Sequence, residues 1–288
     1  MAEKVLYLEN PKGDSVYYLL SPKKVQSALA EGEPFVIRLP QSRRDKGKPL
    51  VAVILGLEKD DYAIDKNYVE ALLAAGADLT FIHYDDVDSQ LEDAQPDAFL
   101  LPGGCFDSPA EFYQEPQRLP PEHELSPRSL AYVYAIDYAN ENQVPVFGIC
   151  AGFQMLAGMA GAKMYVSLKD ELACPLPHKE PKDKIAHDVH LSADSRLRRI
   201  TGAGTLQVNS VHSEGVINDS AVLEGLRIVA VSADNVAEAV EHPDGRFVLG
   251  VQWHPEYLYR KDRAAAALFA AFVKAAGEYK EKKDDDHR

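Results

Sequence analysis

Apolar residues in the first half of the chain gather into short continuous runs and do not alternate with polar ones. Such runs are typical of strands that are buried on both faces of a sheet. They predict strands over Leu50–Leu57, Leu79–His83, Ala98–Leu101 and Val144–Ile149. Amphipathic segments predict helices over Asp65–Ala75, capped by Gly76, and over Pro127–Asn142. Strands alternating with helices favour a mostly parallel sheet covered on both faces.

The pattern changes after a helix that we expect over Phe153–Met159. Short strand-like stretches follow at Ala162–Ser167, Asp188–Leu191, Thr205–Val211, Leu226–Ser232, Ala237–Glu241 and Phe247–Gln252. Turn signals at Asn218-Asp219 and Pro243-Asp-Gly245 indicate a meander of hairpins. An Ala-rich helix is predicted over Arg263–Ala275. Together these elements predict one α/β domain over residues 49–276. We expect a mostly parallel central sheet flanked by helices, with a β-rich insertion in its second half.

The two ends of the chain differ from this domain. Residues 1–48 form an N-terminal extension of unknown role, with strands predicted at Val5–Leu8, Val16–Leu20 and Phe35–Leu39 and a helix at Pro22–Ala30. A polar stretch over 41–48 indicates a loop that leads into the main domain. Residues 277–288 are a charged C-terminal tail, which we expect to be solvated and frayed.

Charge and composition exclude several classes of partner. The formal net charge of −14 repels nucleic acid, since phosphate contacts need clustered lysines and arginines. No apolar run approaches the ~20 residues of a membrane helix, so we expect no membrane contact. The N-terminus lacks the basic and apolar regions of a signal peptide. Three cysteines without metal spacing or an even count favour a reducing, cytoplasmic location.

Cys150 is the most informative residue. It lies in Val144-Pro-Val-Phe-Gly-Ile-Cys-Ala-Gly-Phe-Gln154, where a predicted strand meets a predicted helix. Glycines on both sides of a nucleophile permit the sharp turn of a nucleophile elbow. A thiol at a helix N-terminus is also stabilised as the reactive thiolate by the helix dipole. The alternative is a small buried core cysteine, which is a common role for this residue type.

A general base is predicted at the end of a later strand, in Gly250-Val-Gln-Trp-His-Pro-Glu256. Pro255 biases His254 toward extended backbone, so that His254 and Glu256 project to the same side. A carboxylate on one ring nitrogen would leave the other free to take a thiol proton. The alternative is a surface loop without special contacts.

Backbone donors for an oxyanion are available in two places. One is the N–H of Ala151, which follows the nucleophile. The other is the pair Gly103-Gly104, which follows the strand Ala98–Leu101 and would let bare N–H groups approach a ligand, unless it is an ordinary turn. All these pieces lie at the C-terminal ends of predicted strands, where open α/β sheets bind their ligands.

Taken together, these motifs resemble the class I glutamine amidotransferase superfamily. Within it the chain is most similar to the γ-glutamyl hydrolase branch, which includes γ-glutamyl-γ-aminobutyrate hydrolases. The resemblance covers about residues 49–275 and implies a flavodoxin-like fold. It rests on Leu101-Pro-Gly-Gly104, Val146-Phe-Gly-Ile-Cys-Ala-Gly-Phe-Gln-Met-Leu156, Val208-Asn-Ser-Val-His-Ser213, Leu226–Glu241 and Gly250-Val-Gln-Trp-His-Pro-Glu-Tyr257.

The resemblance implies a role for each matching residue. Cys150 would be the nucleophile, His254 the general base and acid, and Glu256 the residue that orients it. Gly104 and Ala151 would form the oxyanion hole, and the substrate pocket would include Gly103, Gln154, His212 and Ser213. The implied reaction is attack on a γ-amide, release of an amine and hydrolysis of a γ-glutamyl thioester. It implies no metal and no organic cofactor.

Two departures from the branch fall near the expected substrate mouth. Relatives often carry a basic residue at the position of Ala151, and acidic residues where this chain has Cys105-Phe-Asp-Ser-Pro109. These two departures leave the identity of the leaving amine open. Cys105 could be a second thiol in the pocket, although we favour a packing or small-residue role because no base accompanies it.

Three functions are compatible with the sequence. The first is a free-standing hydrolase of γ-glutamyl compounds, with a small-molecule substrate as its partner. The second is a glutaminase subunit that supplies ammonia to a separate synthase. The third is a catalytically silent binding or regulatory relative, because a fold alone does not establish activity. The oligomeric state is open, with a homodimer as one alternative.

Overall fold

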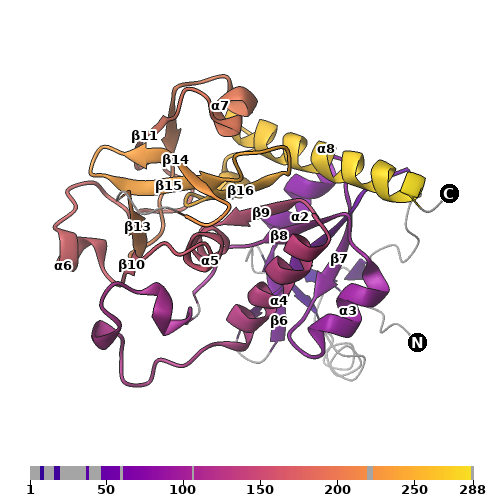
Figure 1. Cartoon of the computed structure of the whole chain (residues 1–288), viewed down its shortest axis with the longest axis horizontal. Coiled ribbons are helices and arrows are strands. Elements are labelled where there is room, and N and C mark those ends of the chain that lie inside the picture. The colour runs from indigo at the N-terminus through magenta and orange to yellow at the C-terminus, as the bar shows by residue number, and fades with distance from the viewer. Residues whose placement is uncertain are drawn as a thin grey trace.

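The computed structural model describes residues 47–58, 61–105, 107–218 and 223–286, together with the backbone of three strands nearer the N-terminus. An 11-stranded sheet forms its centre (Figure 1). The strands of this sheet are β4 (Leu50–Ile54), β7 (Asp78–Ile82), β8 (Ala98–Leu101), β9 (Val146–Ile149), β10 (Met164–Tyr165), β11 (His187–Leu191), β12 (Thr205–Val208), β13 (Gly215–Ile217), β14 (Arg227–Ser232), β15 (Val236–Glu241) and β16 (Val248–Val251).

The helices of the described residues lie on both faces of this sheet. They are α2 (Lys66–Ala74), α3 (Val87–Ala94), α4 (Pro127–Glu141), α5 (Ala151–Met159), α6 (Leu168–Leu172), α7 (Arg196–Thr201) and α8 (Arg263–Asp286), with 3₁₀ turns η1 (Ala110–Phe112), η2 (Pro116–Arg118) and η3 (Pro255–Tyr257). Within the described part of the chain, no helix combines the length and the apolarity that crossing a bilayer requires.

The sheet has a parallel half and an antiparallel half. Its order is β12-β11-β14-β15-β16-β9-β8-β4-β7, and every pairing from β16 to β7 is parallel. Pairings from β12 to β16 are antiparallel, and they form the β-rich second half. The α/β fold class that we predicted is thereby confirmed. Because β9 and β16 are neighbours, their C-terminal ends bring Cys150 and His254 to the same edge of the sheet.

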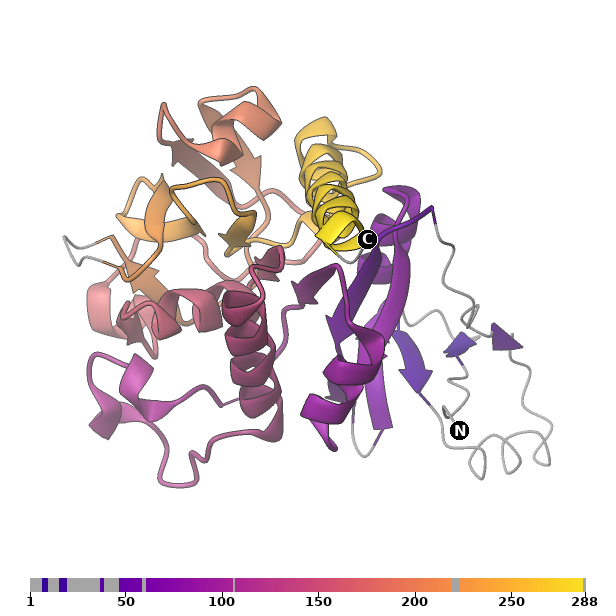
Figure 2. The same cartoon turned by 45° about the vertical axis from the view of Figure 1, so that its right-hand side comes forward.

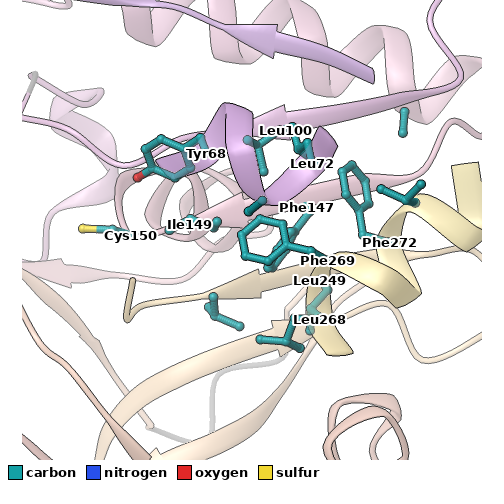
Figure 3. Packing of buried hydrophobic residues seen from close by; sticks show 14 of the residues in the cluster. Tyr68, Leu72, Leu100, Phe147, Ile149, Cys150, Leu249, Leu268, Phe269 and Phe272 are labelled. Atoms are coloured by element: carbon teal, nitrogen blue, oxygen red, sulfur yellow. The ribbon is translucent and has the colours of Figure 1, made fainter. Parts of the chain in front are cut away.

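The continuous apolar runs are explained by two hydrophobic layers. Successive residues of β8 alternate between them: Leu100 packs with helices α2 and α8, while Phe99 and Leu101 pack with α3, α4 and α5. Figure 3 shows the first layer, in which Phe147 of β9 meets Phe269 and Phe272 of α8. A strand buried on both sides must be apolar at every position, which is the pattern that the sequence carries.

The strand that we predicted over Leu50–Leu57 is wrong in its second half. Strand β4 ends at Ile54, and Gly56 begins β5 (Gly56–Glu58), which pairs antiparallel with β6 (Asp61–Asp65) in a second sheet of order β3-β1-β2-β6-β5. The Arg128 guanidinium lies against Gly56, where an added Cβ would stand 3.2 Å from its Nη1 atom. The chain therefore leaves the central sheet at a point that hydrophobicity alone does not mark.

The N-terminal extension contributes three strands to this second sheet (Figure 2). The strands β1 (Tyr7–Glu9), β2 (Val16–Leu19) and β3 (Ile37–Arg38) coincide broadly with the three that we predicted. Strand β2 pairs with β6, so that the extension adds its strands to the β5–β6 hairpin. The helix predicted at Pro22–Ala30 lies outside the described residues.

Our expectation of a frayed C-terminal tail is wrong for the residues up to Asp286, which are helical. Helix α8 continues well past Ala275, because charged side chains of its last turns reach the domain. Lys280 Nζ donates to the carbonyl oxygen of Lys48 at 3.0 Å, and Lys283 Nζ lies 3.1 Å from Oδ1 of buried Asp97. The pattern also did not predict the short elements α3, α6, α7 and β13.

We expect Lys283→Met to destabilise the fold by about 1–3 kcal/mol, since it removes a charged partner from the buried carboxylate of Asp97. Lys274→Met is the matched control on the same helix, because its ion pair with Glu278 is exposed and should contribute below about 0.5 kcal/mol. Urea denaturation of both variants measures the difference. Equal losses of unfolding free energy would remove any special role of the Lys283–Asp97 pair.

Candidate active site

Cys150 occupies a strained turn between β9 and α5. Its φ and ψ of 51° and −104° lie in a region that side-chain-bearing residues rarely adopt. The turn is held on both sides, since Cys150 N–H donates to Val251 O at 2.8 Å and its carbonyl accepts from Gln154 N–H at 3.0 Å. The thiol is thus placed above the end of the sheet, at the first turn of a helix, as in a nucleophile elbow.

Two glycines make this turn sterically possible. A Cβ on Gly152 would stand 2.1 Å from the carbonyl oxygen of Leu101, and one on Gly148 would stand 2.7 Å from the backbone of Gly152. Helix α5 therefore approaches the strands more closely than any other residue type would allow. The glycine on each side of Cys150 in the sequence motif is explained by this close contact.

We expect Gly152→Ala to destabilise the protein by about 2–3 kcal/mol and to lower its activity, because the added methyl group must push α5 away from Leu101. The matched control is Gly277→Ala in α8, where a Cβ meets nothing within 4 Å. That substitution should stabilise the helix by up to about 1 kcal/mol. Thermal unfolding compares the two, and a loss of stability in both would mean that crowding at Leu101 is not the cause.

His254 and Glu256 complete a buried group with Cys150. Glu256 Oε1 lies 2.6 Å from His254 Nδ1, and the Cys150 side chain is near enough to the His254 ring to raise its pKa. Asn209 fixes the backbone of His254, because its side chain accepts from the His254 N–H and donates to its carbonyl oxygen, both at 2.9 Å. The imidazole is therefore held between the thiol and a fully buried carboxylate.

The electrostatics of this group favour a protonated imidazole. Burial lowers the pKa of His254, but the charges of Glu256 and Cys150 and the hydrogen bond to Glu256 raise it more, to about 10. An imidazolium facing a thiolate is the state in which a cysteine attacks a carbonyl carbon. The arrangement can thus supply both a nucleophile and an acid for the leaving group.

The double-glycine turn after β8 closes the site from the other side. Gly103 is packed so closely that a Cβ there would lie 2.7 Å from the His254 ring and 3.0 Å from the Cys150 side chain. The N–H groups of Gly104 and Ala151 have no hydrogen-bond partner among the described residues. They are thus available to an oxyanion near the thiol, as an acyl-transfer site requires.

Tyr68 and Arg128 hold the double-glycine turn in place. Gly103 N–H donates to the Tyr68 hydroxyl at 2.9 Å, and that hydroxyl lies 3.5 Å from His254 Nδ1. Arg128 Nη2 donates to the carbonyl oxygens of Pro102 at 3.3 Å and Gly103 at 3.0 Å. Both side chains of this clamp are buried, and together they fix the orientation of the peptide that carries the Gly104 N–H.

Sequence reasoning missed both residues of the clamp. Tyr68 lies on the apolar face of α2 and has the pattern of a core aromatic residue. Arg128 did carry a signal, because a cation in the first turn of a helix is opposed by the helix dipole and needs another partner. That signal marks the residue as unusual but does not name the turn that it contacts.

A cavity of about 330 Å³ opens in front of the thiol. Of the predicted site residues, Gly103, Gly104, Cys150 and His254 line it, and so does Cys105, which is exposed. The packing role that we favoured for Cys105 is therefore wrong, while the small-residue role that we favoured with it stays a prediction. The cavity is completed by side chains that the sequence did not single out, namely Ile64, Asp65, Tyr68, Arg128, Lys182, Val211 and Tyr257.

The other predicted pocket residues lie elsewhere. Gln154 is buried, and its Nε2 donates to Gln252 Oε1 at 3.2 Å and to Glu214 O at 3.3 Å. His212 is also buried, and burial together with the neighbouring His178 lowers its pKa to about 3. Ser213 is exposed and lies 3.5 Å from Lys179 Nζ. None of the three predicted pocket residues lines the cavity at Cys150.

Comparison with known proteins identifies the family. The family model described as peptidase C26 matches residues 47–256, which include the elbow, the double glycine and the His254–Glu256 pair. The chain belongs to the peptidase C26 family. This match confirms the family resemblance that the sequence motifs suggested.

Individual relatives of this peptidase C26 chain are distant. It is 28% identical over 223 residues to a γ-glutamyl-γ-aminobutyrate hydrolase of Escherichia coli K12, covering 74% of this chain and 85% of the relative. It is 32% identical over 218 residues to a Mycobacterium tuberculosis protein provisionally named a glutamine amidotransferase, covering 74% of this chain and 67% of the relative. The glutaminase domain of Trypanosoma brucei CTPS, solved with bound acivicin, shares the fold, with a TM-score of 0.54, 18% identity and coverage of 80% and 94%.

Proposed function

We propose that this protein hydrolyses the γ-amide bond of a γ-glutamyl compound through a γ-glutamyl thioester on Cys150. The observation that carries the proposal is that a strained Cys150 and His254 line one cavity, with Glu256 behind the imidazole and the available N–H groups of Gly104 and Ala151 beside the thiol. Membership of the peptidase C26 family supports an amide hydrolase. The Escherichia coli relative, named for a γ-glutamyl amide of γ-aminobutyrate, supports this substrate class.

In the first half of the reaction, the Cys150 thiolate attacks the γ-carbonyl carbon. The electrons of the carbonyl bond move to its oxygen, which the N–H groups of Gly104 and Ala151 stabilise. The imidazolium of His254 then gives its proton to the leaving nitrogen as the C–N bond breaks. The products of this half are a free amine, a γ-glutamyl thioester and a neutral imidazole that Glu256 keeps oriented.

In the second half, water replaces the amine. Neutral His254 takes a proton from the attacking water, and the C–S bond of the thioester breaks as the second tetrahedral intermediate collapses. Glutamate leaves, and the thiolate–imidazolium pair is restored. Each step uses only the side chains and backbone groups of the candidate site.

The cavity favours a substrate that brings a carboxylate. Arg128 and Lys182 both line it, and they place two cations near the thiol. Lys182 is held at the rim, because its Nζ donates to the Tyr257 hydroxyl at 2.9 Å, and that hydroxyl in turn donates to Asp65. A γ-glutamyl group carries an α-carboxylate, which complements these two cations, and an α-amino group, which complements the Asp65 carboxylate in the same lining.

The test is to assay the purified protein alone against a panel of γ-glutamyl amines and glutamine. We expect unaided release of amine from at least one γ-glutamyl amine, together with a covalent acivicin adduct on Cys150 in peptide mass spectra. Slow glutamine turnover that accelerates only when an ammonia-consuming synthase is added would point to a glutaminase subunit instead. Neither turnover nor an adduct at Cys150 would point to a catalytically silent relative.

A further inference from the structure

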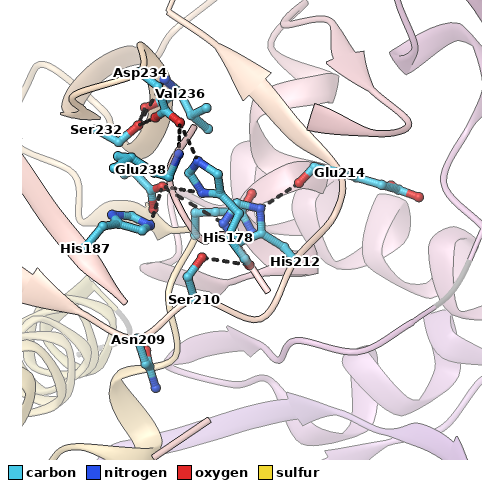
Figure 4. A network of polar contacts seen from close by, with 12 residues as sticks. His178, His187, Asn209, Ser210, His212, Glu214, Ser232, Asp234, Val236 and Glu238 are labelled. Atoms are coloured by element: carbon cyan, nitrogen blue, oxygen red, sulfur yellow. Dashed lines mark hydrogen bonds and ion pairs between the residues drawn. The ribbon is translucent and has the colours of Figure 1, made fainter. Parts of the chain in front are cut away.

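A second cluster of chemically active side chains lies in the β-rich half, outside the cavity at Cys150. Three histidines and a glutamate reach it from four separate segments: His178 follows α6, His187 lies on β11, His212 follows β12, and Glu238 lies on β15 (Figure 4). Around Glu238 Oε1 stand His187 Nε2 at 3.5 Å, His178 Nδ1 at 3.7 Å and His212 Nε2 at 4.0 Å. The four groups thus converge on one point.

The converging atoms lack hydrogen-bond partners although all of them are buried. Each of the four residues is at most 6% exposed. Within the described part of the chain, His178 Nδ1, His187 Nε2, His212 Nε2 and both carboxylate oxygens of Glu238 have no hydrogen bond. Buried polar atoms without partners are rare in folded proteins, and so many in one place require an explanation.

The outer ring nitrogens, in contrast, each lie near an oxygen that can accept a hydrogen bond. His178 Nε2 lies 3.1 Å from the carboxylate of Asp234, and His212 Nδ1 lies 2.7 Å from the carbonyl oxygen of Glu214. His187 Nδ1 lies 3.3 Å from the carbonyl oxygen of Asp188. When the outer nitrogen donates its hydrogen in this way, the inner nitrogen presents a lone pair, as metal-binding histidines do.

We propose that His178, His187, His212 and Glu238 bind a divalent transition-metal ion, with Zn²⁺ best suited to the donor set. Three imidazole nitrogens and one carboxylate match the ligand types and the count of a tetrahedral zinc site. The inner atoms of His178, His187 and Glu238 lie within 4.8 Å of one another. His212 Nε2 stands 4.0 Å from Glu238 Oε1, as the fourth ligand. Tetrahedral ligands at about 2.0–2.2 Å from one ion lie about 3.3–3.6 Å apart, so binding would draw the first three atoms together by up to about 1.5 Å.

The proposed site differs from our sequence-based expectation of no metal. That expectation considered cysteine spacing and the reaction, in which, of these four residues, only His212 was assigned a part, as a pocket residue. The ligands share no short motif, since each comes from a different segment. A site with four protein ligands is closed to substrate, so the proposed ion would be structural.

The ion would connect the β-rich half to the elbow helix. The carbonyl oxygen of Glu214 contacts His212 Nδ1 and also accepts a hydrogen bond from Gln154 Nε2 of α5. Fixing His212 therefore fixes the backbone that Gln154 contacts, one turn beyond Cys150. This role does not depend on the proposed reaction, because the cluster is defined by its own contacts.

The first test measures metal in the full-length protein. We expect close to one Zn²⁺ per chain by elemental analysis after expression in zinc-supplemented medium. After chelation, Co²⁺ should restore the intense visible absorption of a tetrahedral site with nitrogen and oxygen ligands, and Zn²⁺ should displace it. Substoichiometric zinc together with no Co²⁺ spectrum would overturn the proposal and leave a metal-free polar network.

Matched variants locate the site. Glu238→Gln and His187→Asn should weaken Zn²⁺ binding by about 10–100-fold or more, as ligand loss does at metal sites. His190→Asn is the control, because His190 lies on β11 with His187 but is exposed, and its Nδ1 lies 3.2 Å from Thr205 Oγ1, away from the cluster. Near-ultraviolet circular dichroism verifies that each variant is folded. Full Zn²⁺ affinity in a folded Glu238→Gln variant, or equal loss in His190→Asn, would place the metal elsewhere.

Discussion

Replacing Cys150 with alanine is expected to lower kcat for γ-glutamyl amide hydrolysis by about 10⁴-fold or more. The variant keeps the oxyanion donors and the cavity but has no atom that can form a thioester. Because the substitution removes a single heavy atom and leaves the rest of the buried turn unchanged, the fold should remain intact. Steady-state assays at saturating substrate, with circular dichroism as a check on folding, measure the effect.

A second thiol in the same cavity provides the matched control. Cys105 lies beside Gly104, is exposed and lines the cavity, but no base accompanies it. Cys105→Ala should therefore change kcat by less than about threefold, well within what loss of a non-reacting contact produces. If Cys105→Ala were as inactive as Cys150→Ala, or if Cys150→Ala kept its activity, the assignment of the nucleophile would be wrong.

Glu256→Gln is expected to lower kcat by about 10²–10⁴-fold and to change the pH dependence. Glu256 raises the pKa of His254, which reaches about 10 in the folded protein. Activity that needs the imidazolium is therefore present below that value and is lost as the pH rises through it. Without the carboxylate charge the pKa of His254 falls, so the alkaline limb of the kcat/KM profile should move to lower pH.

A neighbouring carboxylate tests whether this shift is specific. Glu214 bonds to the Tyr113 hydroxyl at 2.8 Å and belongs to neither the triad nor the cavity at Cys150. Glu214→Gln should leave the alkaline limb where it is in the wild type. An unmoved limb in Glu256→Gln, or an equal displacement in both variants, would show that Glu256 does not set the protonation of His254.

The part of the site that sequence predicts well is the part encoded locally. The elbow at Cys150 follows from two glycines and a strand-to-helix change within a few residues, and the steric reason for those glycines is seen at Leu101. His254 and Glu256 do meet, but for a different reason from the one we expected, because the backbone after His254 forms the 3₁₀ turn η3 and not an extended chain. The parallel half of the sheet follows from apolar runs that two hydrophobic layers require.

What sequence could not predict depends on contacts between distant segments. Tyr68 reaches the double-glycine turn from a helix 35 residues earlier in the chain, and nothing local distinguishes it from a core tyrosine. The cluster around Glu238 is assembled by antiparallel pairing of strands whose register no motif records. Helix α8 extends because Asp97 and Lys48 lie where Lys283 and Lys280 can reach them.

The pairing of β2 with β6 joins the N-terminal extension to a strand that lines the cavity at Cys150. Ala63, Ile64 and Asp65 of β6 line that cavity, and β6 lies between β5 and strand β2 of the extension. The extension therefore supports the strand that lines the cavity. Exchange of this segment between relatives offers a way to alter which amine is accepted while every reacting group stays unchanged.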